Sequence, residues 1–306
     1  MNKSVLISGY GSIGRRHANI LSKLVKKKNI TILTKQKVAN FHTIKTLRSL
    51  RDIDPHYVVV CNPTSDHFKK IKFFEKYYKN KVILVEKPLF SRPTKITVKK
   101  NKYFIGYNLR FNPIINFIKE KIKSKKIWSV SVFCGSYLPN WRNNINYQKS
   151  SSAKKKLGGG VLLDLSHELD YIQWLFGKIS IQYCKSKKFS NLKIETDDFL
   201  NLVGKTKKVP SVQITLNYYT RETTRQIIID GKNLCIKADL IKKRVVYYNG
   251  SKRKVYNFKN SNKKSEYKQQ HLALLKNKNA NKLCTYKEGE QLVYLINQIK
   301  FKSKKS

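Results

Sequence analysis

The sequence lacks the features that would tie the chain to a membrane or to a disulfide framework. Hydrophobic residues make up 40% of its 306 residues, yet no apolar run approaches the length of a membrane span. The start leads directly into a strand pattern rather than a signal peptide, so the predicted location is the cytoplasm. The five cysteines are odd in number, far apart and never spaced as C-x-x-C. This spacing argues against disulfides and zinc ribbons, and it predicts reduced, partly buried thiols.

Acidic residues are scarce. The chain has 18 Asp and Glu against 65 Lys and Arg, for a formal net charge of +47. Such an excess is typical of nucleic-acid-binding proteins, and a basic protein of that class is one alternative. The lysines are, however, scattered over every segment, which indicates compositional drift and solvated faces. We therefore expect no specific nucleic-acid partner and no membrane partner, although the charge favours the approach of an anionic substrate.

A glycine motif opens the chain. Gly9, Gly11 and Gly14 form G-x-G-x-x-G between the apolar run 5–7 and residues at helical spacing. In a dinucleotide-binding fold, Gly9 makes the tight turn, Gly11 admits the pyrophosphate and Gly14 lets the helix approach the strand. An ordinary flexible turn is the alternative. Strand, motif and helix occur in the required order, which favours a dinucleotide site at the helix N-terminus.

The end of the next predicted strand, 29–33, bears on the choice of cofactor. An acidic residue there would bind the ribose 2′-hydroxyl of NAD, but Thr34 and Lys35 stand in its place. These residues favour the 2′-phosphate of NADP. The alternative is that the lysine belongs only to the general excess, which leaves NAD open.

Further strand and helix patterns alternate up to residue 122. Apolar runs at 57–61, 81–85 and 103–107 are typical of buried parallel strands, and helices are expected at 67–78 and before 122. The alternation predicts a doubly wound parallel sheet of the Rossmann type in a dinucleotide-binding domain, 1–110. Loops at the carboxyl ends of such strands are where ligands bind.

The pattern changes in the second half. Short segments that alternate apolar and polar residues predict a mostly antiparallel sheet with one covered face and one open face. These strands are expected at 127–134, 179–185, 199–203, 212–217, 226–230, 233–237 and 244–248. Helices are expected at 160–176, 265–276 and 287–299. The predicted fold is therefore α/β followed by α+β, with a substrate-binding domain at 111–306.

The predicted helix 160–176 is apolar almost all round, follows three glycines and carries titratable residues on one stripe. The stripe consists of Asp164, His167, Glu168 and Tyr171. Asp164 and His167 form a candidate acid/base pair, whereas Glu168 and Asp170 are expected in a structural network. No convincing third ligand for a metal is present.

Lys87 is a second candidate for proton transfer. It stands at a predicted strand end between Glu86 and Pro88, so its position is well defined. With so many lysines in the chain, composition alone does not single it out.

Taken together, these motifs resemble those of the Gfo/Idh/MocA oxidoreductases. The resemblance runs in order over essentially the whole chain and is most specific in E-K-P and G-G-G-x-x-x-D. The matching segments are Gly9-Tyr10-Gly11-Ser12-Ile13-Gly14, Cys61-Asn62-Pro63-Thr64 with His67, Glu86-Lys87-Pro88, Tyr107 to Pro113, and Gly158-Gly159-Gly160 with Asp164 and His167. A branch of surface-sugar biosynthesis is the most similar, through residues 137–142, Tyr147 and 164–171.

The resemblance implies a nicotinamide-dependent oxidoreductase acting on a sugar, polyol or nucleotide-linked sugar. It implies that Lys87 orients and relays the proton of the reacting hydroxyl, with His167 as acid/base and Asp164 assisting. The residues implied to bind the cofactor are Gly9, Gly11, Ser12, Ile13, Gly14, Thr34, Lys35, Asn62, Pro63, Thr64, His67, Glu86 and Lys87. Those implied to bind the substrate are Tyr107, Arg110, Trp141, Arg142 and Tyr147. A loop tryptophan such as Trp141 is alternatively a packing anchor.

Two features depart from the family pattern. The step from Asp164 to His167 is three residues, where the common family form has four, and the acid after residue 33 is missing. A non-catalytic dinucleotide-binding or scaffold protein of the same fold is therefore kept as an alternative. By family analogy, a homo-oligomer built on the open sheet is expected.

Overall fold

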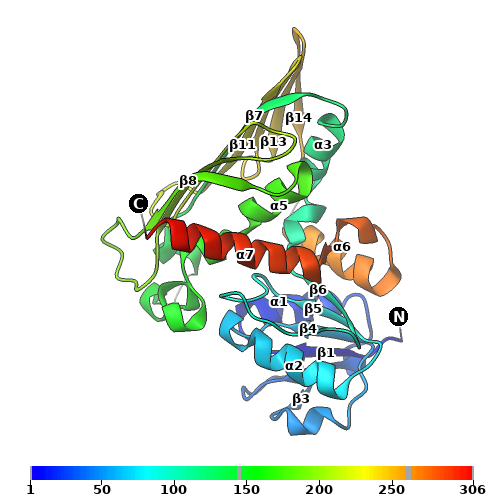
Figure 1. Ribbon diagram of the computed structural model, residues 1–306. Coiled ribbons are helices and arrows are strands. Elements are labelled where there is room, and N and C mark those ends of the chain that lie inside the picture. The colour runs from blue at the N-terminus through cyan, green and yellow to red at the C-terminus, as the bar shows by residue number, and fades with distance from the viewer. Residues whose placement is uncertain (1, 143–145, 260–262, 305–306) are drawn as a thin grey trace. The chain divides into compact units, whose positions relative to one another are not determined.

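The computed structural model describes residues 2–142, 146–259 and 263–304 (Figure 1). The chain divides into two compact units. Unit 1 comprises Met1–Phe111 and Asn262–Val293, and unit 2 comprises Asn112–Ser261 and Tyr294–Ser306. The segment 262–293, which the predicted boundary at 110/111 assigns to the second domain, thus belongs to unit 1. Its attachment includes a 2.7 Å hydrogen bond from Lys3 Nζ to the Leu275 carbonyl.

Unit 1 is built on a seven-stranded sheet, sheet A, in the order β15-β6-β5-β4-β1-β2-β3. All its pairs are parallel except β15 with β6. The central strands are apolar on both faces, as buried parallel strands must be. The strands are β1 (Val5–Ser8), β2 (Ile30–Leu33), β3 (His42–Ile44), β4 (Tyr57–Val60), β5 (Val82–Val85), β6 (Lys102–Ile105) and β15 (Cys284–Thr285).

Helices pack with sheet A, and their apolar stripes face the core. Within α1 (Ser12–Leu21) the buried residues include Gly14, His17, Ala18 and Leu21, which share one face at helical spacing. The other helices of unit 1 are α2 (His67–Tyr77), α6 (Lys263–Lys276) and the first part of α7 (Tyr286–Lys302). One buried cluster joins residues of α1, sheet A and α6.

Unit 2 is built on an eight-stranded sheet, sheet B, in the order β14-β13-β12-β11-β7-β10-β9-β8. Its pairs are antiparallel except β7 with β10. The strands are β7 (Ile127–Gly135), β8 (Ser180–Lys187), β9 (Phe199–Lys205), β10 (Ser211–Asn217), β11 (Thr224–Gly231), β12 (Leu234–Asp239), β13 (Arg244–Asn249) and β14 (Lys252–Asn257). The predicted fold class is confirmed.

One face of sheet B is covered and the other is open. Along β10, Val212, Ile214 and Leu216 are buried, whereas Gln213 between them is exposed. Helices α3 (Pro113–Lys121) and α5 (His167–Phe176) lie on one side of this sheet (Figure 1). The end of α7 is held to β8 by a hydrogen bond from Ser186 N to Ser303 Oγ.

The predicted helix 160–176 is two helices, so that prediction was wrong in one respect. A short helix α4 (Val161–Asp164) is followed by Leu165, whose φ of −96° and ψ of 27° leave the helical region, and α5 begins at His167. The Ser166 hydroxyl donates to the Leu163 carbonyl at 2.9 Å and stabilises the break. Asp164 and His167 therefore do not lie on one continuous helical stripe.

Two further features concern the whole described chain. No helix in the ranges given above is both long and apolar enough to cross a bilayer. All five cysteines are free, and four of them are buried, which confirms the prediction of unpaired thiols.

Candidate functional site

The glycine turn between β1 and α1 has the geometry that a dinucleotide needs. Gly9 has a φ of +96°, and its N–H donates to the Leu33 carbonyl at 3.0 Å. A Cβ on Gly14 would collide with the Gly9 carbonyl oxygen, so this position requires glycine for close packing of helix on strand. A Cβ on Gly11 would meet nothing within 4 Å. The space beside Gly11 is thus open, as a binding site for a pyrophosphate would be.

Asn62, Pro63 and Thr64 follow β4 beside this turn. The Ser8 hydroxyl at the end of β1 donates to Asn62 Oδ1 at 2.7 Å, which joins the two loops. His67, the first residue of α2, is buried, and its Nε2 atom lies 3.0 Å from the Asn62 carbonyl oxygen. Its Nδ1 atom lies 3.0 Å from the Leu89 carbonyl oxygen, so the ring links the loops after β4 and β5. Burial lowers the pKa of His67.

Glu86 and Lys87 follow β5 at the same edge of sheet A. The Lys87–Pro88 peptide bond is cis, and Lys87 is half-buried. Glu86 Oε1 lies 2.8 Å from His17 Nε2, and Glu86 Oε2 accepts a hydrogen bond from the Lys87 N–H at 3.3 Å. A Cβ on Gly106, which follows β6, would come within 2.8 Å of the Glu86 carboxylate. The orientation of this carboxylate is therefore closely defined.

A buried chain of polar side chains extends from Glu86 through unit 1. The second nitrogen of His17, Nδ1, lies 2.8 Å from His271 Nε2, and His271 Nδ1 lies 2.9 Å from the Tyr57 hydroxyl. All four residues are at most 7% exposed. Burial and the neighbouring His17 lower the pKa of His271. We refer to these four residues as the Glu86–Tyr57 chain.

Sequence reasoning did not find the Glu86–Tyr57 chain. One signal was present, because His17 is a polar residue on the apolar stripe of α1, between Gly14 and Leu21. The sequence around His271 gives no such signal, because its hydrogen-bond partner His17 lies 254 residues away.

Thr34 and Lys35 lie directly after β2, next to the glycine turn in sheet A. The Thr34 hydroxyl accepts a hydrogen bond from the Gln36 N–H at 3.1 Å. The Gln36 side chain in turn accepts from Arg15 Nη2 at 3.2 Å, and the Arg15 guanidinium lies 5.5 Å from the centre of the Tyr10 ring. Two cations, Arg15 and Lys35, thus belong to the segments that follow β1 and β2.

Tyr107 and Arg110 follow β6 and are both buried in the structure. The Arg110 guanidinium donates to Glu288 Oε1 at 2.8 Å and to the Leu283 carbonyl at 3.3 Å. Burial of Glu288 by itself would raise the pKa of this carboxyl, but the Arg110 guanidinium and the hydrogen bonds to the carboxylate lower it. Arg110 therefore anchors α7 within unit 1, and its predicted contact with substrate stays a prediction.

The three glycines before α4 form a tight structural turn in unit 2. Gly158 and Gly160 have φ values of +80° and +116°. A Cβ on Gly159 would collide with the carbonyl oxygens of Ser151 and Ser152, and one on Gly160 would collide with Asp197. The Asp197 carboxylate accepts a hydrogen bond from the Leu162 N–H at 3.0 Å, and burial raises its pKa. Gly158 and Gly160 are thus favoured by their positive φ, and Gly159 is required by backbone packing.

Asp164, at the end of α4, receives a short hydrogen bond of 2.6 Å from the Tyr218 hydroxyl. Burial and the Asp164 carboxylate raise the pKa of Tyr218, so its hydroxyl remains a donor. The Trp141 ring packs edge-on against Tyr218, with ring centres 5.2 Å apart, and Trp141 Nε1 donates to Ser136 Oγ at 3.0 Å. A predicted substrate residue and a predicted catalytic residue are therefore joined through Tyr218.

His167 and Glu168 begin α5. His167 is half-buried, whereas Glu168 is fully buried and forms a two-bond ion pair with Arg225. The bonds from Arg225 Nε and Nη2 to the carboxylate measure 2.7 and 3.3 Å. Glu168 thus belongs to a structural network between α5 and β11.

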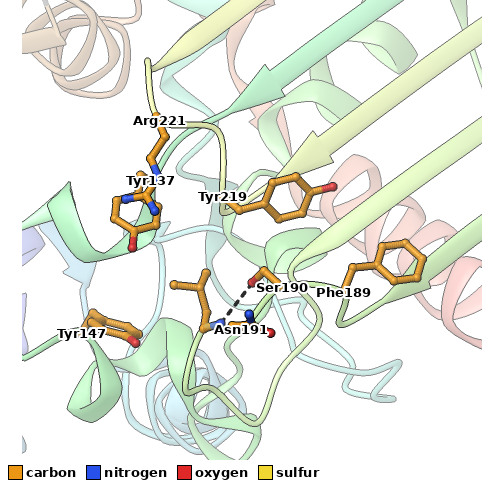
Figure 2. Close-up of a pocket in the computed structure, with 8 residues that line it drawn as sticks. Tyr137, Tyr147, Phe189, Ser190, Asn191, Tyr219 and Arg221 are labelled. Atoms are coloured by element: carbon orange, nitrogen blue, oxygen red, sulfur yellow. Dashed lines mark hydrogen bonds between the residues drawn. The ribbon is translucent and has the colours of Figure 1, made fainter.

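Unit 2 also holds an aromatic cavity of about 490 Å³ (Figure 2). Its lining comes from the segments after β7, β8 and β10 and from residue 147. The lining residues are Tyr137, Tyr147, Phe189, Ser190, Asn191, Leu192, Tyr219 and Arg221. A small cleft next to it is lined by Trp141, Arg142 and Tyr147 among others, so Tyr147 lines both. Of the predicted substrate residues, these three come together in unit 2.

The structure groups the remaining predicted residues by unit. Loops at the carboxyl edge of sheet A carry the glycine turn, Thr34, Asn62, Glu86 and Lys87. Asp164 and His167 belong to unit 2. Over the described part of the chain, no group of three His, Cys, Asp or Glu residues has the arrangement of a metal site.

Residues 115–236 match the GFO/IDH/MocA C-terminal domain family. The match confirms, over this segment, the resemblance that the motifs indicated. No curated protein sequence is similar enough to this chain to match it.

Several solved structures share the fold of the whole chain. Levoglucosan dehydrogenase in complex with NADH and levoglucosan has a TM-score of 0.83 and 16% identity, over 100% of this chain and 98% of that one. UDP-N-acetylglucosamine 3-dehydrogenase GnnA from Acidithiobacillus ferrooxidans has a TM-score of 0.77 and 13% identity, over 98% and 97% of the two chains. The dehydrogenase MviM from Clostridium difficile has a TM-score of 0.72 and 17% identity, over 98% and 99%.

Proposed function

We propose that this chain is an NAD(P)-dependent oxidoreductase that acts on a hydroxyl group of a sugar, a polyol or a nucleotide-linked sugar. The observation that carries the proposal is the glycine turn, with Gly14 against the Gly9 carbonyl and open space beside Gly11. The GFO/IDH/MocA domain and the similar fold of sugar dehydrogenases that bind NADH support it.

The cofactor supplies hydride acceptance or donation at C4 of its nicotinamide when bound. In the oxidation direction, the hydroxyl-bearing carbon of the sugar loses a hydride and its oxygen loses a proton, which leaves a carbonyl. Lys87 orients this hydroxyl and relays its proton, and His167, the general acid/base, accepts it. Asp164, held by Tyr218, assists His167. These roles are those that the family motifs imply for this chain.

We infer a preference for NADP from the end of β2. Lys35 and Arg15 belong to the segments that follow the two adjacent strands β2 and β1, and no acidic residue stands between 34 and 37. A cation there favours a 2′-phosphate over a free hydroxyl. The ratio of the affinities for NADPH and NADH measures this preference, and Lys35→Ala is expected to lower it. If Lys35→Ala left the ratio of NADPH to NADH affinity unchanged, Lys35 would not determine the choice of cofactor.

We also propose a role in surface polysaccharide biosynthesis, because residues 137–142 and 164–171 resemble the branch of the family that acts there. We further propose that the chain forms a homo-oligomer through the open face of sheet B. Ile228 on β11 is 37% exposed, on the face opposite the buried Ile227 and Ile229, and Trp128 on β7 is 51% exposed. Apolar residues on an open sheet favour contact with a second copy. Light scattering is expected to give an oligomer for the wild type and a smaller species for Ile228→Glu.

Turnover tests the proposed chemistry. The wild type is screened for reduction of NAD(P)⁺ with neutral sugars, polyols, sugar acids and nucleotide sugars, and the best substrate is used for the variants. Lys87→Met and His167→Ala are each expected to lower kcat by about a hundredfold or more. Lys69→Met, a matched change at an exposed lysine on α2, is expected to retain activity. Cofactor binding without turnover on any of these substrates would instead favour a non-catalytic protein of the same fold.

A further inference from the structure

The aromatic cavity of unit 2 has the size and position of a ligand site. Its volume of about 490 Å³ lies within the range of about 300–1,000 Å³ that small-molecule sites occupy. It lies where β7, β8 and β10 end, because Tyr137, the 189–192 segment and Tyr219 follow these strands directly (Figure 2). The cavity is formed entirely by unit 2.

The walls of the cavity offer ring faces together with polar atoms. Tyr137, Tyr147, Phe189 and Tyr219 line the cavity, with Tyr137 and Tyr147 on one side in Figure 2 and Phe189 and Tyr219 on the other, and Asn191 adds an amide. The C–H faces of a sugar ring pack on aromatic rings, while hydroxyl and amide groups bond to its hydroxyls. This composition fits a sugar better than a purely apolar molecule.

Arg221 supplies a positive charge at the rim of this cavity. Its guanidinium carbon lies 3.9 Å from the centre of the Tyr137 ring. Within the described ranges, no carboxylate forms an ion pair with it, in contrast to Arg110 and Arg225 in the buried pairs. The donors of a guanidinium lie in one plane, and stacking on an aromatic ring leaves its edge facing outward, which suits two-bond recognition of a carboxylate or phosphate.

The wall formed by residues 189–192 is held in place before any ligand arrives. The fully buried Asp198 carboxylate accepts hydrogen bonds from Phe189 N at 2.7 Å, from Ser190 N at 3.0 Å and from the Ser190 hydroxyl. The Ser190 hydroxyl in turn accepts from Leu192 N at 3.2 Å (Figure 2). Binding there costs little loop ordering.

The cavity is connected with the proposed reaction site through neighbouring residues. Tyr219 lines it, and the adjacent Tyr218 donates to Asp164. Tyr147 lines both the cavity and the small cleft that contains Trp141 and Arg142. A ligand that fills the cavity therefore contacts Tyr219, whose neighbour in the sequence bonds to Asp164.

We propose that this cavity binds a sugar bearing a negatively charged group, with the aromatic walls against the ring and the Arg221 guanidinium on the carboxylate or phosphate. This inference rests on the proposed function and narrows its substrate class to anionic sugars. A sugar acid and a sugar phosphate present the same chemistry to Arg221.

Calorimetric titration in the absence of cofactor tests the inference with three probes, glucose, glucuronate and glucose 1-phosphate. Glucose and glucuronate carry no phosphate for the glycine turn, and binding of glucose 1-phosphate at that turn would persist in Arg221→Gln, which distinguishes it from binding in the cavity. The wild type is expected to bind at least one of the two anions about tenfold or more tightly than glucose. Preference for glucuronate identifies a carboxylate ligand, and preference for the phosphate identifies a phosphorylated sugar.

Arg221→Gln is expected to abolish the preference for the anion and to weaken its binding by about ten- to a hundredfold. Arg253→Gln is the matched control, because Arg253 is an exposed arginine on β14, at the far edge of sheet B from β8. It removes the same charge from the same unit, so it reports general attraction to a basic protein. Arg221→Lys is expected to retain only part of the preference, since it keeps the charge but loses the planar fork.

Three results would overturn the inference. They are equal binding of glucose and both anions, no binding of any probe, and equal losses in Arg221→Gln and Arg253→Gln. Titration of Arg221→Gln with NADH separates this failure from that of the proposed function. Unchanged NADH binding together with an unchanged anion preference would refute the role of this cavity and leave the oxidoreductase proposal intact.

Discussion

His17 Nδ1 and His271 Nε2 lie 2.8 Å apart in the core of unit 1, although 254 residues separate them in the sequence. One direction of donation satisfies the whole Glu86–Tyr57 chain. The Tyr57 hydroxyl donates to His271, His271 Nε2 donates to His17, and His17 Nε2 donates to Glu86. Because the Glu86–Tyr57 chain is buried, water cannot replace a lost hydrogen bond, and each of these groups needs its partner.

His17→Gln is expected to lower the free energy of unfolding of unit 1 by about 2 kcal/mol or more, because it leaves buried polar atoms of Glu86 and His271 without their partner. Amide hydrogen exchange of β1 and β4 measures the change within this unit. His42→Gln, at an exposed position on β3, is the control and is expected to leave exchange unchanged. If the amides of β1 and β4 were protected equally in His17→Gln and His42→Gln, the Glu86–Tyr57 chain would contribute nothing to stability.

Two buried histidines of unit 1 predict that its stability falls in mild acid. Burial lowers the pKa of both His67 and His271, so the folded unit holds them neutral while the unfolded chain protonates them below about pH 6.5. The free energy of unfolding is therefore full above about pH 6.5 and declines as pH falls, by up to about 1.4 kcal/mol per pH unit for each histidine.

The contribution of His271 is separable. His17 and Tyr57 contact its ring, and Glu86 lies beyond His17. His271→Gln is expected to reduce the slope of unfolding free energy against pH between 5 and 6.5, again followed by hydrogen exchange of unit 1. An identical slope in the variant and the wild type would contradict a neutral, buried His271.

The buried ion pair of unit 2 gives a further prediction. Glu168→Gln leaves the Arg225 guanidinium, whose side chain is only 16% exposed, without its counter-charge, and is expected to lower the free energy of unfolding of unit 2 by about 3 kcal/mol. Glu120→Gln removes the same charge from an exposed pair with Lys123, where about 0.5 kcal/mol or less is expected. Tryptophan fluorescence during urea unfolding reports this unit, because Trp128, Trp141 and Trp174 all belong to it. Equal losses in the two variants would argue against the buried pair.

The sequence predicted most of the elements because burial leaves a local pattern. Strands β1, β4 and β5 are continuous apolar runs, and the strands from β7 to β13 alternate apolar and polar residues. Three strands were not predicted. β3 carries His42 and Thr43, β14 carries Lys252, Arg253 and Lys254, and β15 has two residues, so none of them shows an apolar period.

Contacts between distant segments account for the rest. The glycine positions were readable because backbone geometry restricts them to one residue type. The return of 262–293 to unit 1 rests on contacts such as that of Lys3 with Leu275, which no local pattern encodes. Tyr218 and Arg221 lie in a loop between two strands without any motif, and only the fold brings them to Asp164 and to the aromatic cavity.

The central claim, that the glycine turn binds a dinucleotide, is tested most directly by titrating wild type, Gly11→Ala and Gly14→Ala with NADH and NADPH. Gly11 has a φ of −72°, and a Cβ there meets nothing, so Gly11→Ala is expected to fold normally and to lose about tenfold or more in affinity through contact with the bound pyrophosphate. Gly14→Ala collides with the Gly9 carbonyl and is expected to lose both stability and binding. Nucleotide binding by Gly11→Ala as tight as that of the wild type, or no binding by the wild type, would contradict the account.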